Sequence, residues 1–182
     1  MKNLFPSKIK PGLRLNLGCG DKILEGYVNV DVVQSRKGVT PDLIADLRNI
    51  PLDPGTADEV LAVHVIEHFY LWEARQLIAH WRDLLKPGGV IVIECPNILT
   101  AAHELINDES LASDITGKRG QLVMWPLYGD PGWEDPLMCH KWGYTPSALI
   151  QLLSECKFRS VRQEPAKFKK KDPRDMRIVG VR

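Results

Sequence analysis

The chain has 182 residues, and its 24 lysine and arginine residues are balanced by 23 aspartate and glutamate residues. A formal net charge of +1 gives no overall field that would attract nucleic acid or an acidic membrane surface. Apolar residues make up 44% of the chain and charged residues 26%, which is the composition of an ordinary globular protein. We therefore expect a single domain over residues 1–182, large enough to bury a substantial core.

The cysteines and the N-terminus bear on the cellular compartment. Cys19, Cys95, Cys139 and Cys156 are scattered and include no C-x-x-C pair, so neither a zinc site nor a disulfide framework is indicated. Residues 1–12 lack the apolar core of a signal peptide, and no run has the length of a membrane span. These features predict a cytoplasmic protein.

Short β-rich runs alternate with helical patterns along the chain. Several of these runs are almost continuously apolar, which is typical of strands that are covered on both faces. Strands are predicted at Leu13–Leu17, Tyr27–Val32, Leu43–Ala45, Val60–Val65, Val90–Cys95, Ser160–Glu164 and Met176–Val181.

Helices are predicted between some of these strands. The apolar residues of Leu71–Leu85 fall on one helical face, and Lys86–Gly89, with its proline and glycines, should end that helix as a turn. Thr145 is an N-cap residue for a helix at Pro146–Cys156, and a further helix is expected at Thr100–Asn107.

The alternation of strand and helix predicts an α/β protein with a seven-stranded, mostly parallel sheet and helices on both faces. The last two strands are joined by the segment 166–175, which has no helical pattern, so they should form an antiparallel pair at one edge. The segment Asp108–Lys141 is rich in glycine, proline and tryptophan. So long an irregular stretch in a small domain predicts a lid or substrate-binding loop.

A glycine turn follows the first predicted strand. Gly18 and Gly20 flank Cys19 and would let a ligand approach the backbone at the carboxyl end of the strand. A dinucleotide-binding motif would place a third glycine at Ile23 and a long helix behind it, but the second strand begins by Tyr27. The turn therefore fits either a different nucleotide-like ligand or a plain strand-to-turn bend.

Two carboxylates end the next strands. Asp31 closes the second strand, where a carboxylate can accept two hydrogen bonds from a ribose diol, although aspartate is also common in turns and caps. Asp46 ends the third strand, where it could accept the exocyclic amine of an adenine.

The motifs LNLGCG, NVD, ADLRNIPL, VLAVHVIEHF and LLKPGGVIVIECPN follow one another over residues 13–97. In order and spacing they resemble the successive motifs of class I S-adenosylmethionine-dependent methyltransferases, above all a small bacterial and phage group often found with surface-polysaccharide genes. The tail HKWGYTPSALIQLLSECKF resembles the end of that group, with CKF where AGF is usual. The resemblance implies a Rossmann-like fold, methyl transfer and S-adenosylmethionine as the cofactor.

The resemblance also assigns cofactor-binding residues. The two glycines would face the methionine part of the cofactor, Asp31 the ribose, and Asp46 with Leu47 the adenine, while His64 would lie beneath the cofactor. The full set is Leu17, Gly18, Cys19, Gly20, Asp31, Val32, Asp46, Leu47 and His64.

Two positions depart from the family pattern. Asn16 stands where an acid is usual, and Lys22 stands where a third glycine is usual. A cofactor without phosphates needs no long helix dipole, and its sulfonium cation can be stabilised by aromatic faces. Aromatic residues available in the irregular segment and just after it are Trp125, Trp133, Trp142 and Tyr144, each of which could instead serve loop packing.

Methyl transfer to oxygen can require a general base. The candidates are His64, Glu67, His68, His103 and His140, of which we favour His140 and then His68. Each histidine could instead be a hydrogen-bonded structural residue. The pair Glu67-His68 could bind a metal, but adjacent helical residues point in different directions, so no metal site is expected.

No Asp/Asn-Pro-Pro-Tyr/Phe motif follows the fourth strand, which favours an oxygen acceptor on a small molecule or sugar. The basic cluster formed by Lys167, Lys169, Lys170, Lys171 and Arg174 is expected to be a solvated hairpin, and nucleic acid is not an expected partner. Two alternatives stay open. One is a catalytically inactive methyltransferase-like binding protein, and the other is a nicotinamide-dependent oxidoreductase, disfavoured by Ile23 and the short first crossover.

Overall fold

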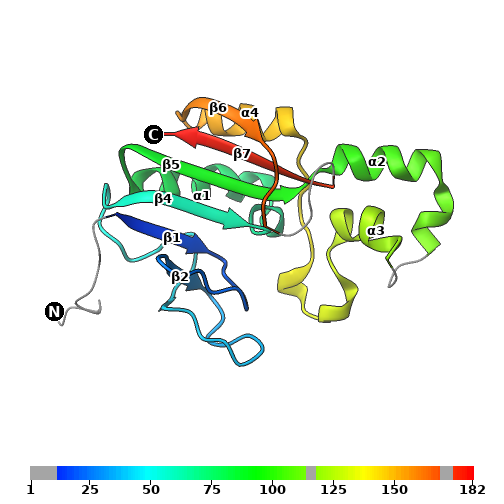
Figure 1. The fold of residues 1–182 in the computed structure, drawn as a ribbon, viewed down its shortest axis with the longest axis horizontal. Coiled ribbons are helices and arrows are strands. Elements are labelled where there is room, and N and C mark those ends of the chain that lie inside the picture. The colour runs from blue at the N-terminus through cyan, green and yellow to red at the C-terminus, as the bar shows by residue number, and fades with distance from the viewer. Residues whose placement is uncertain (1–11, 114–117, 169–173) are drawn as a thin grey trace.

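The computed structural model describes residues 12–113, 118–168 and 174–182, so residues 169–171 of the predicted basic hairpin and residues 1–11 lie outside the described residues (Figure 1). One seven-stranded sheet has the order β3-β2-β1-β4-β5-β7-β6. The strands are β1 (Leu13–Leu17), β2 (Val28–Asp31), β3 (Leu43–Ile44), β4 (Ala57–Val63), β5 (Leu85–Pro96), β6 (Arg159–Glu164) and β7 (Asp175–Val181). The α-helices are α1 (Leu71–Leu84), α2 (Ile98–Asn107), α3 (Gly120–Tyr128) and α4 (Pro146–Glu155). The 3-10 helices are η1 (Ile66–His68), η2 (Glu109–Ser113), η3 (Pro131–Trp133) and η4 (Pro136–Met138).

The sheet is mostly parallel, as the sequence predicted. Strands β1 to β5 run in the same direction, whereas β7 is antiparallel to both β5 and β6. The antiparallel pair lies at one edge, and β7 is the strand that runs against the others. This reversal places Asp175, the first residue of β7, opposite Pro96, the last residue of β5. The start of β7 therefore reaches the edge of the sheet where the parallel strands end.

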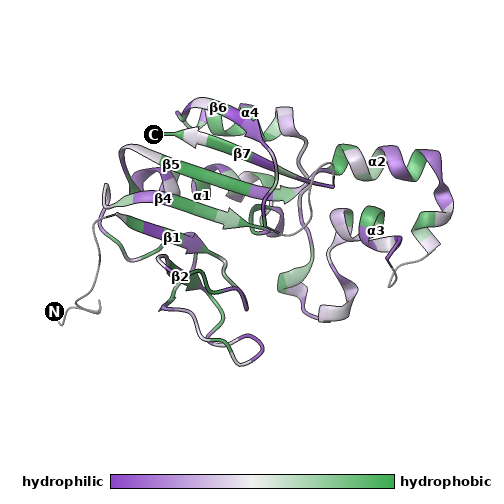
Figure 2. Cartoon of the chain, in the orientation of Figure 1, coloured by the Kyte–Doolittle hydropathy of each residue, from purple (hydrophilic) through white to green (hydrophobic). Residues whose placement is uncertain are grey.

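The main core lies on one face of the sheet. In β5, Ile91, Ile93 and Cys95 point to this face and pack with residues of α1 and α4. Figure 2 shows apolar residues along the middle of β5 and the second half of β4, with polar residues near the start of β4. Trp81 of α1 is fully buried here, and its indole N–H donates to the carbonyl of Leu47 at 3.0 Å, which fixes the chain after β3 to the helix.

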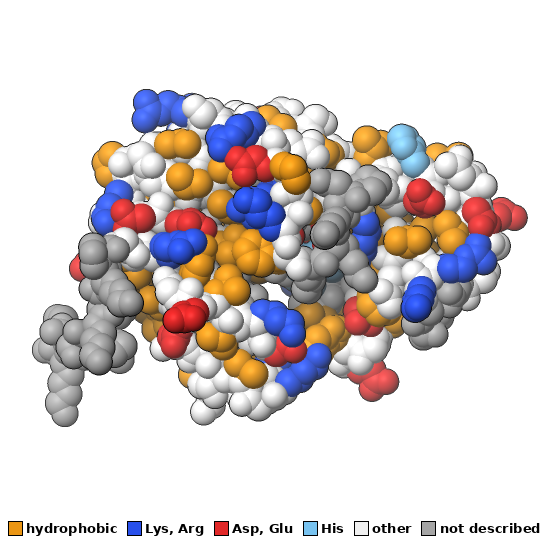
Figure 3. Space-filling view, viewed as in Figure 1, with side chains coloured by type: hydrophobic (Ala, Val, Ile, Leu, Met, Phe, Trp, Pro, Cys, Tyr) orange, Lys and Arg blue, Asp and Glu red, His pale blue; other side chains and the backbone are white. Residues whose placement is uncertain are grey.

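The opposite face carries a smaller apolar cluster. Leu61, Val92 and Val179 form this cluster, and the surface seen in Figure 3 shows basic and acidic side chains around apolar ones. Helices were expected on both faces, but in the described ranges α1 and α4 share one face. The physical reason is that the connections 18–27 and 32–42 consist of turns and bends without a helix.

Several element boundaries differ from those predicted. Lys86–Gly89, expected as a turn, opens strand β5, although Gly88 has a φ of +83° and the pairing with β4 shifts register there. Helix α2 begins at Ile98, since the side chain of Asn97 accepts a hydrogen bond from the Leu99 N–H. The predicted cap of α4 is confirmed, because Thr145 accepts the Ala148 N–H at 3.2 Å.

The irregular segment Asp108–Lys141 contains a helix that the sequence did not predict. Helix α3 begins with a glycine and has Pro126 inside it, and both features weaken a helical pattern. Helices α2 and α3 lie beside each other beyond the carboxyl ends of the parallel strands (Figure 1). In the part of the chain that the structure describes, no helix is both long and apolar enough to cross a membrane.

Candidate active site

The glycine turn after β1 depends on two residues with left-handed backbone. Gly18 has a φ of +63° and Gly20 a φ of +56°, values that side chains rarely adopt. A Cβ on Gly18 would lie only 2.6 Å from Cγ2 of Val65, so the glycine also allows close packing against the chain after β4. Between the glycines, the Cys19 N–H donates to the Val30 carbonyl at 3.1 Å. The turn therefore lies next to the ends of both neighbouring strands.

Asp31 holds this turn from the end of β2. Its carboxylate accepts the Gly20 N–H at 2.8 Å and the Val33 N–H at 3.0 Å, and the residue is only 8% exposed. Leu17, at the end of β1, is completely buried, whereas Val32 is 53% exposed. Each carboxylate oxygen of Asp31 retains capacity to accept a further hydrogen bond.

Asn16, the departure from the family pattern, has a structural partner. Its side-chain N–H group donates to the Lys22 carbonyl at 3.0 Å and to Oδ1 of Asn29 at 2.9 Å. Asn29 Oδ1 also accepts the Leu24 N–H at 2.8 Å, and its amide donates to Asp42 at 2.7 Å. This buried amide network replaces the missing helix by tying the short connection to the strand beneath it.

The two residues predicted to frame an adenine lie after β3. Leu47 is buried, with 6% exposure. Asp46 is half-buried and pairs with Arg48 at 2.7 Å, and hydrogen bonds from that guanidinium lower the pKa of the carboxyl. The side chain of Asp46 is therefore ionised and already has a cationic partner in this structure.

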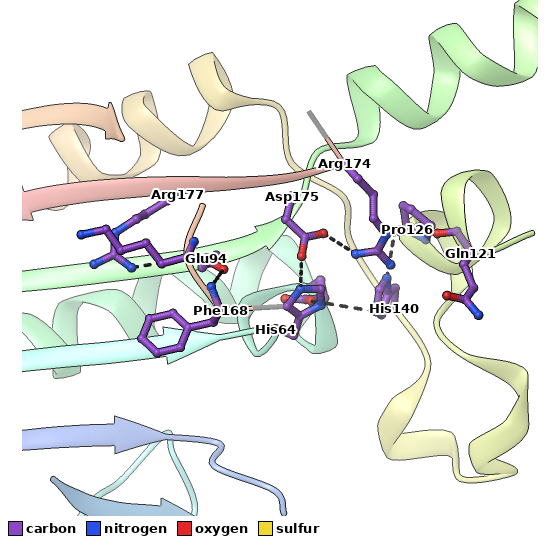
Figure 4. Close-up of polar contacts among 11 residues, drawn as sticks. His64, Glu94, Gln121, Pro126, His140, Phe168, Arg174, Asp175 and Arg177 are labelled. Carbon is purple, nitrogen blue, oxygen red and sulfur yellow. Dashed lines mark hydrogen bonds and ion pairs between the residues drawn. The ribbon is translucent and has the colours of Figure 1, made fainter. Parts of the chain in front are cut away.

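His64 follows directly after β4 and connects two buried carboxylates. It has a left-handed φ of +54°, and its backbone N–H donates to the Glu94 carbonyl at 2.7 Å. Its ring Nε2 lies 2.8 Å from Oδ2 of Asp175 (Figure 4). Its Nδ1 lies 3.3 Å from Oε1 of Glu67. Because each ring nitrogen faces a carboxylate, His64 can donate from both only as an imidazolium.

Glu67 is buried beside three histidines. Burial alone would raise the pKa of this carboxyl, but the adjacent His64 imidazole and the charges of His68 and His140 lower it to about 2. Although His64 is at ion-pair distance, neither oxygen of the carboxylate accepts a hydrogen bond from any described residue. The site therefore contains an ionised carboxylate whose hydrogen-bonding capacity is not satisfied by the residues around it.

His68 and His140 approach Glu67 from two segments of the chain. Nδ1 of His140 lies 2.9 Å from the Pro126 carbonyl, and Nδ1 of His68 lies 3.2 Å from the Cys139 carbonyl. Since a carbonyl only accepts hydrogen bonds, both Nδ1 atoms must carry the proton. In the neutral rings both Nε2 atoms then keep a lone pair. Burial lowers the pKa of His68, which favours its neutral form.

These side chains line a cavity of about 240 Å³ beyond the ends of β4 and β5. Its wall is completed by the α3 segment and the chain that follows, which is attached to η1 where the Lys141 and Trp142 N–H groups donate to the Glu67 carbonyl. The lining residues are His64, His68, Gln121, Trp125, Asp130, Trp133, Met138, His140 and Arg174.

Not every candidate from the sequence lies at this cavity. Of the aromatic candidates, Trp125 and Trp133 line it, whereas Tyr144 is packed in the main core and Trp142 is 44% exposed. His103 is exposed on α2. The expectation that Glu67 and His68 point apart is wrong, because both lie in the single 3-10 turn η1 and reach the same cluster as His140.

Sequence reasoning missed Asp175 and Gln121 altogether, and it assigned Arg174 to a solvated hairpin. In the structure, Arg174 donates to the Gln121 carbonyl at 3.0 Å and pairs with Asp175, which is completely buried. A signal was available for Asp175, since an antiparallel last strand must begin at the edge where the parallel strands end. No local sequence pattern marks Gln121 of α3, whose carbonyl accepts the hydrogen bond from Arg174.

Comparisons with known proteins agree with this geometry. Residues 15–93 match the sequence profile of the family described as "Methyltransferase domain". A probable S-adenosylmethionine-dependent methyltransferase of Mycolicibacterium smegmatis is 36% identical over 55 residues, which cover 30% of this chain and 21% of that relative. The match thus spans only about a fifth of the relative's length.

Solved structures with low identity share the fold. A SAM-dependent methyltransferase from Archaeoglobus fulgidus has a TM-score of 0.64 at 21% identity, with coverage of 96% of this chain and 88% of that one. The Burkholderia thailandensis 1,6-didemethyltoxoflavin-N1-methyltransferase, solved with 1,6-didemethyltoxoflavin and S-adenosylhomocysteine, has a TM-score of 0.61 at 15% identity, with coverage of 95% and 72%.

The sheet order and the reversed strand β7 form a Rossmann-like sheet, and the chain shares its fold with solved SAM-dependent methyltransferases. Residues 15–93 therefore resemble a methyltransferase domain, and the matched proteins are described as S-adenosylmethionine-dependent methyltransferases. Membership of the polysaccharide-associated subgroup stays a prediction.

Proposed function

We propose that this protein transfers the methyl group of S-adenosylmethionine to an oxygen atom of a small molecule held in the cavity beyond β4. One observation carries the proposal. Gly18 of the glycine turn packs against Val65, and Val65 is the residue directly after His64, which lines the cavity. A cofactor on the glycine turn would therefore have its reactive end next to the histidine cluster.

The residues of the turn fit such a cofactor. A side chain on Gly18 would fill the space beside Val65, and the buried Asp31 carboxylate has lone pairs left for the two hydroxyls of a ribose. We assign Leu17, Gly18, Cys19 and Gly20 to the methionine part, and Asp31 and Val32 to the ribose. When bound, S-adenosylmethionine supplies the electrophilic methyl group for an in-line displacement.

The proposal gives different roles to the remaining predicted cofactor residues, Asp46, Leu47 and His64. Asp46 and Leu47 are assigned to the adenine, which requires Asp46 to keep or exchange its Arg48 partner. His64 is better suited to order the cavity than to contact the cofactor directly, because both ring nitrogens already face carboxylates. Its backbone, directly after β4, lies between the glycine turn and the cavity.

His140 and His68 are the proposed proton acceptors for the acceptor hydroxyl. The carbonyl partners of their Nδ1 atoms orient both rings, and in the neutral rings Nε2 is the atom that can take a proton. His140 is the stronger candidate because its side chain is 8% exposed and lines the cavity from the segment predicted to be a lid. Excluding water there would favour transfer to the acceptor over side reactions.

The size of the cavity supports a small acceptor. Its volume of about 240 Å³ lies below the roughly 300–1,000 Å³ common for ligand sites, so the reacting part of the acceptor must be compact. The 1,6-didemethyltoxoflavin-N1-methyltransferase of Burkholderia thailandensis, which has the same fold, was solved with 1,6-didemethyltoxoflavin bound. A sugar hydroxyl would also fit this size, and nucleic acid remains an unexpected partner.

A methyl-transfer assay with a labelled methyl group tests the proposal. A panel of sugars, nucleotide sugars, phenols and amines would be supplied, and mass spectrometry would locate the added methyl group. We expect an O-methylated product, with turnover reduced about 10²-fold or more in His140→Gln and S-adenosylhomocysteine affinity unchanged. His103→Gln, which alters an exposed histidine away from the cavity, serves as the control.

Methyl transfer to amines alone would contradict the choice of oxygen. Equal loss of cofactor affinity and turnover in His140→Gln would contradict its role as a base. Cofactor binding without turnover on any acceptor would favour the inactive binding protein considered above.

A further inference from the structure

The cluster of Glu67, His68 and His140 has a property that proton transfer alone does not require. One ligand-type atom from each residue lies within 4.8 Å of those from the other two, and the cluster borders the cavity. The Glu67 carboxylate is 2% exposed, and neither oxygen accepts a hydrogen bond from a described residue. A buried carboxylate in this state is costly unless a cation compensates it.

The surroundings of the two histidines favour a metal ion over an additional hydrogen-bond donor. Each Nδ1 is directed at a backbone carbonyl, Pro126 for His140 and Cys139 for His68, which fixes the tautomer with a lone pair on Nε2. Metal-binding histidines commonly have such an outer partner on the second ring nitrogen. One ring nitrogen of each histidine and one carboxylate oxygen thus come together as a three-residue ligand set.

Neighbouring imidazoles reach only one of the two oxygens of the Glu67 carboxylate. His64 is at ion-pair distance from one carboxylate oxygen, Oε1, at 3.3 Å, and its other nitrogen is committed to Asp175. Arg174 lines the same cavity, but its guanidinium is held by Asp175 and the Gln121 carbonyl. The second oxygen of Glu67, Oε2, has no ion-pair partner among the described residues.

We propose that Glu67, His68 and His140 bind a divalent first-row transition-metal ion at the wall of the cavity. Two imidazoles and one carboxylate suit zinc, cobalt, iron or manganese better than magnesium or calcium, which prefer oxygen ligands. With three ligands from the protein, the ion keeps open positions for water or an acceptor oxygen.

The metal site is argued from the cluster itself, but its role in catalysis rests on the proposed function. A cation there would use the lone pairs of His68 and His140, so in the metal-bound protein it would replace these two bases as the group that activates the acceptor. It would bind the acceptor hydroxyl and favour its deprotonated form, with the proton released to water. An acceptor with two neighbouring hydroxyls, or a hydroxyl beside a carbonyl, would chelate the ion and gain a fixed orientation. The substrate class that this site would select is therefore a small chelating oxygen compound.

Metal binding can be tested without turnover. The full chain would be stripped with a chelator, then titrated with Co²⁺ while the visible absorption is followed, and with Zn²⁺ and Mg²⁺ by calorimetry. We expect one Co²⁺ or Zn²⁺ per chain, with Mg²⁺ bound at least about tenfold more weakly. Glu67→Gln, His68→Gln and His140→Gln should each weaken Co²⁺ binding by about tenfold or more, with His103→Gln as the control.

Circular dichroism would show whether each variant is folded. His140→Gln changes a residue of the segment outside the sheet, so it tests the site even if Glu67→Gln fails to fold. Failure of Co²⁺ and Zn²⁺ to bind the wild-type chain, or unchanged Co²⁺ binding in folded His140→Gln, would overturn the proposal. Metal binding with methyl transfer that survives chelation would keep the site but remove its role in the reaction.

Discussion

The side chains of His64 and Asp175 lie 2.8 Å apart, Nε2 to Oδ2, although 111 positions separate them in the sequence. His64 follows β4 and Asp175 begins β7, so the contact exists only because β7 runs antiparallel beside β5. This pair joins the parallel part of the sheet to its antiparallel strand at the wall of the cavity.

Asp175→Asn tests this contact directly. The substitution keeps the shape of the side chain but removes the charge that faces His64 and Arg174. We expect the free energy of unfolding to fall by about 1–3 kcal/mol, because charged partners remain buried without compensation. Urea denaturation measures this free energy of unfolding, and Asp53→Asn, at an exposed aspartate, is the control. Equal stability of the two variants would show that the contact is energetically neutral.

Gly18→Ala should be more damaging than Gly26→Ala. Both residues have positive φ, at +63° and +80°, so both variants carry backbone strain of about 1 kcal/mol or more. Only at Gly18 would the added Cβ meet another side chain, with Val65 Cγ2 at 2.6 Å, whereas nothing lies within 4 Å at Gly26. Denaturation of the two variants isolates the steric contribution, and the double variant Gly18→Ala/Val65→Ala should recover it. Similar losses at both glycines would contradict the close packing.

Asp31→Asn should weaken S-adenosylhomocysteine binding by about 10–100-fold, since a charged acceptor is lost from the ribose. Asparagine is preferable to alanine here because its amide oxygen can still accept one of the two N–H groups, from Gly20 or Val33, that the two carboxylate oxygens accept, whereas alanine would lose both bonds. Calorimetry measures the affinity, with the exposed Glu25→Gln from the same connection as the control. Unchanged affinity in folded Asp31→Asn would mean that Asp31 only holds the turn.

Stability should decrease in mild acid partly because of His80. Its Nε2 accepts the Ile50 N–H at 2.9 Å, and burial lowers its pKa from 6.5, a shift that Asp83 partly opposes. A histidine with a lowered pKa favours the neutral folded state, so its contribution is complete above about pH 6.5 and is lost as the pH falls below that value.

His80→Gln removes this titration while leaving an acceptor for Ile50. Thermal unfolding between about pH 5 and 7 should therefore show a weaker pH dependence in the variant than in the wild type. Other histidines, including His68, contribute equally to both proteins. Parallel stability curves would contradict the assignment to His80.

Several strands were predictable because they are short, mainly apolar runs with clear boundaries, as in β1, where the predicted and observed ranges are both Leu13–Leu17. The extended start of β5 was not, because Lys86–Gly89 contains the residues of a turn, and only pairing with β4 makes it part of the sheet. Helix α3 escaped prediction since Pro126 and its initial glycine oppose a helix locally. There, tertiary packing against α2 outweighs local propensity.

The candidate site, too, could be predicted from the sequence only in part. His68 and His140 were singled out because histidine is a residue of acid–base chemistry, whereas their convergence with Glu67 depends on the path of the segment 120–142. That path follows from contacts such as Trp133 beside Lys37, with 4.4 Å between the Nζ atom and the ring centre, which no local pattern reveals. Asn16 illustrates the reverse case, since the sequence marked it as unusual and the structure supplies the reason in its bond to Asn29.

Titration of the full chain with S-adenosylmethionine and, separately, with a nicotinamide dinucleotide tests the central claim most directly. Calorimetry should give one binding site for S-adenosylmethionine and no heat with the dinucleotide, because the turn at Gly18 and Gly20 lacks the long helix that a pyrophosphate requires. Heat with the dinucleotide and none with S-adenosylmethionine would contradict the assignment.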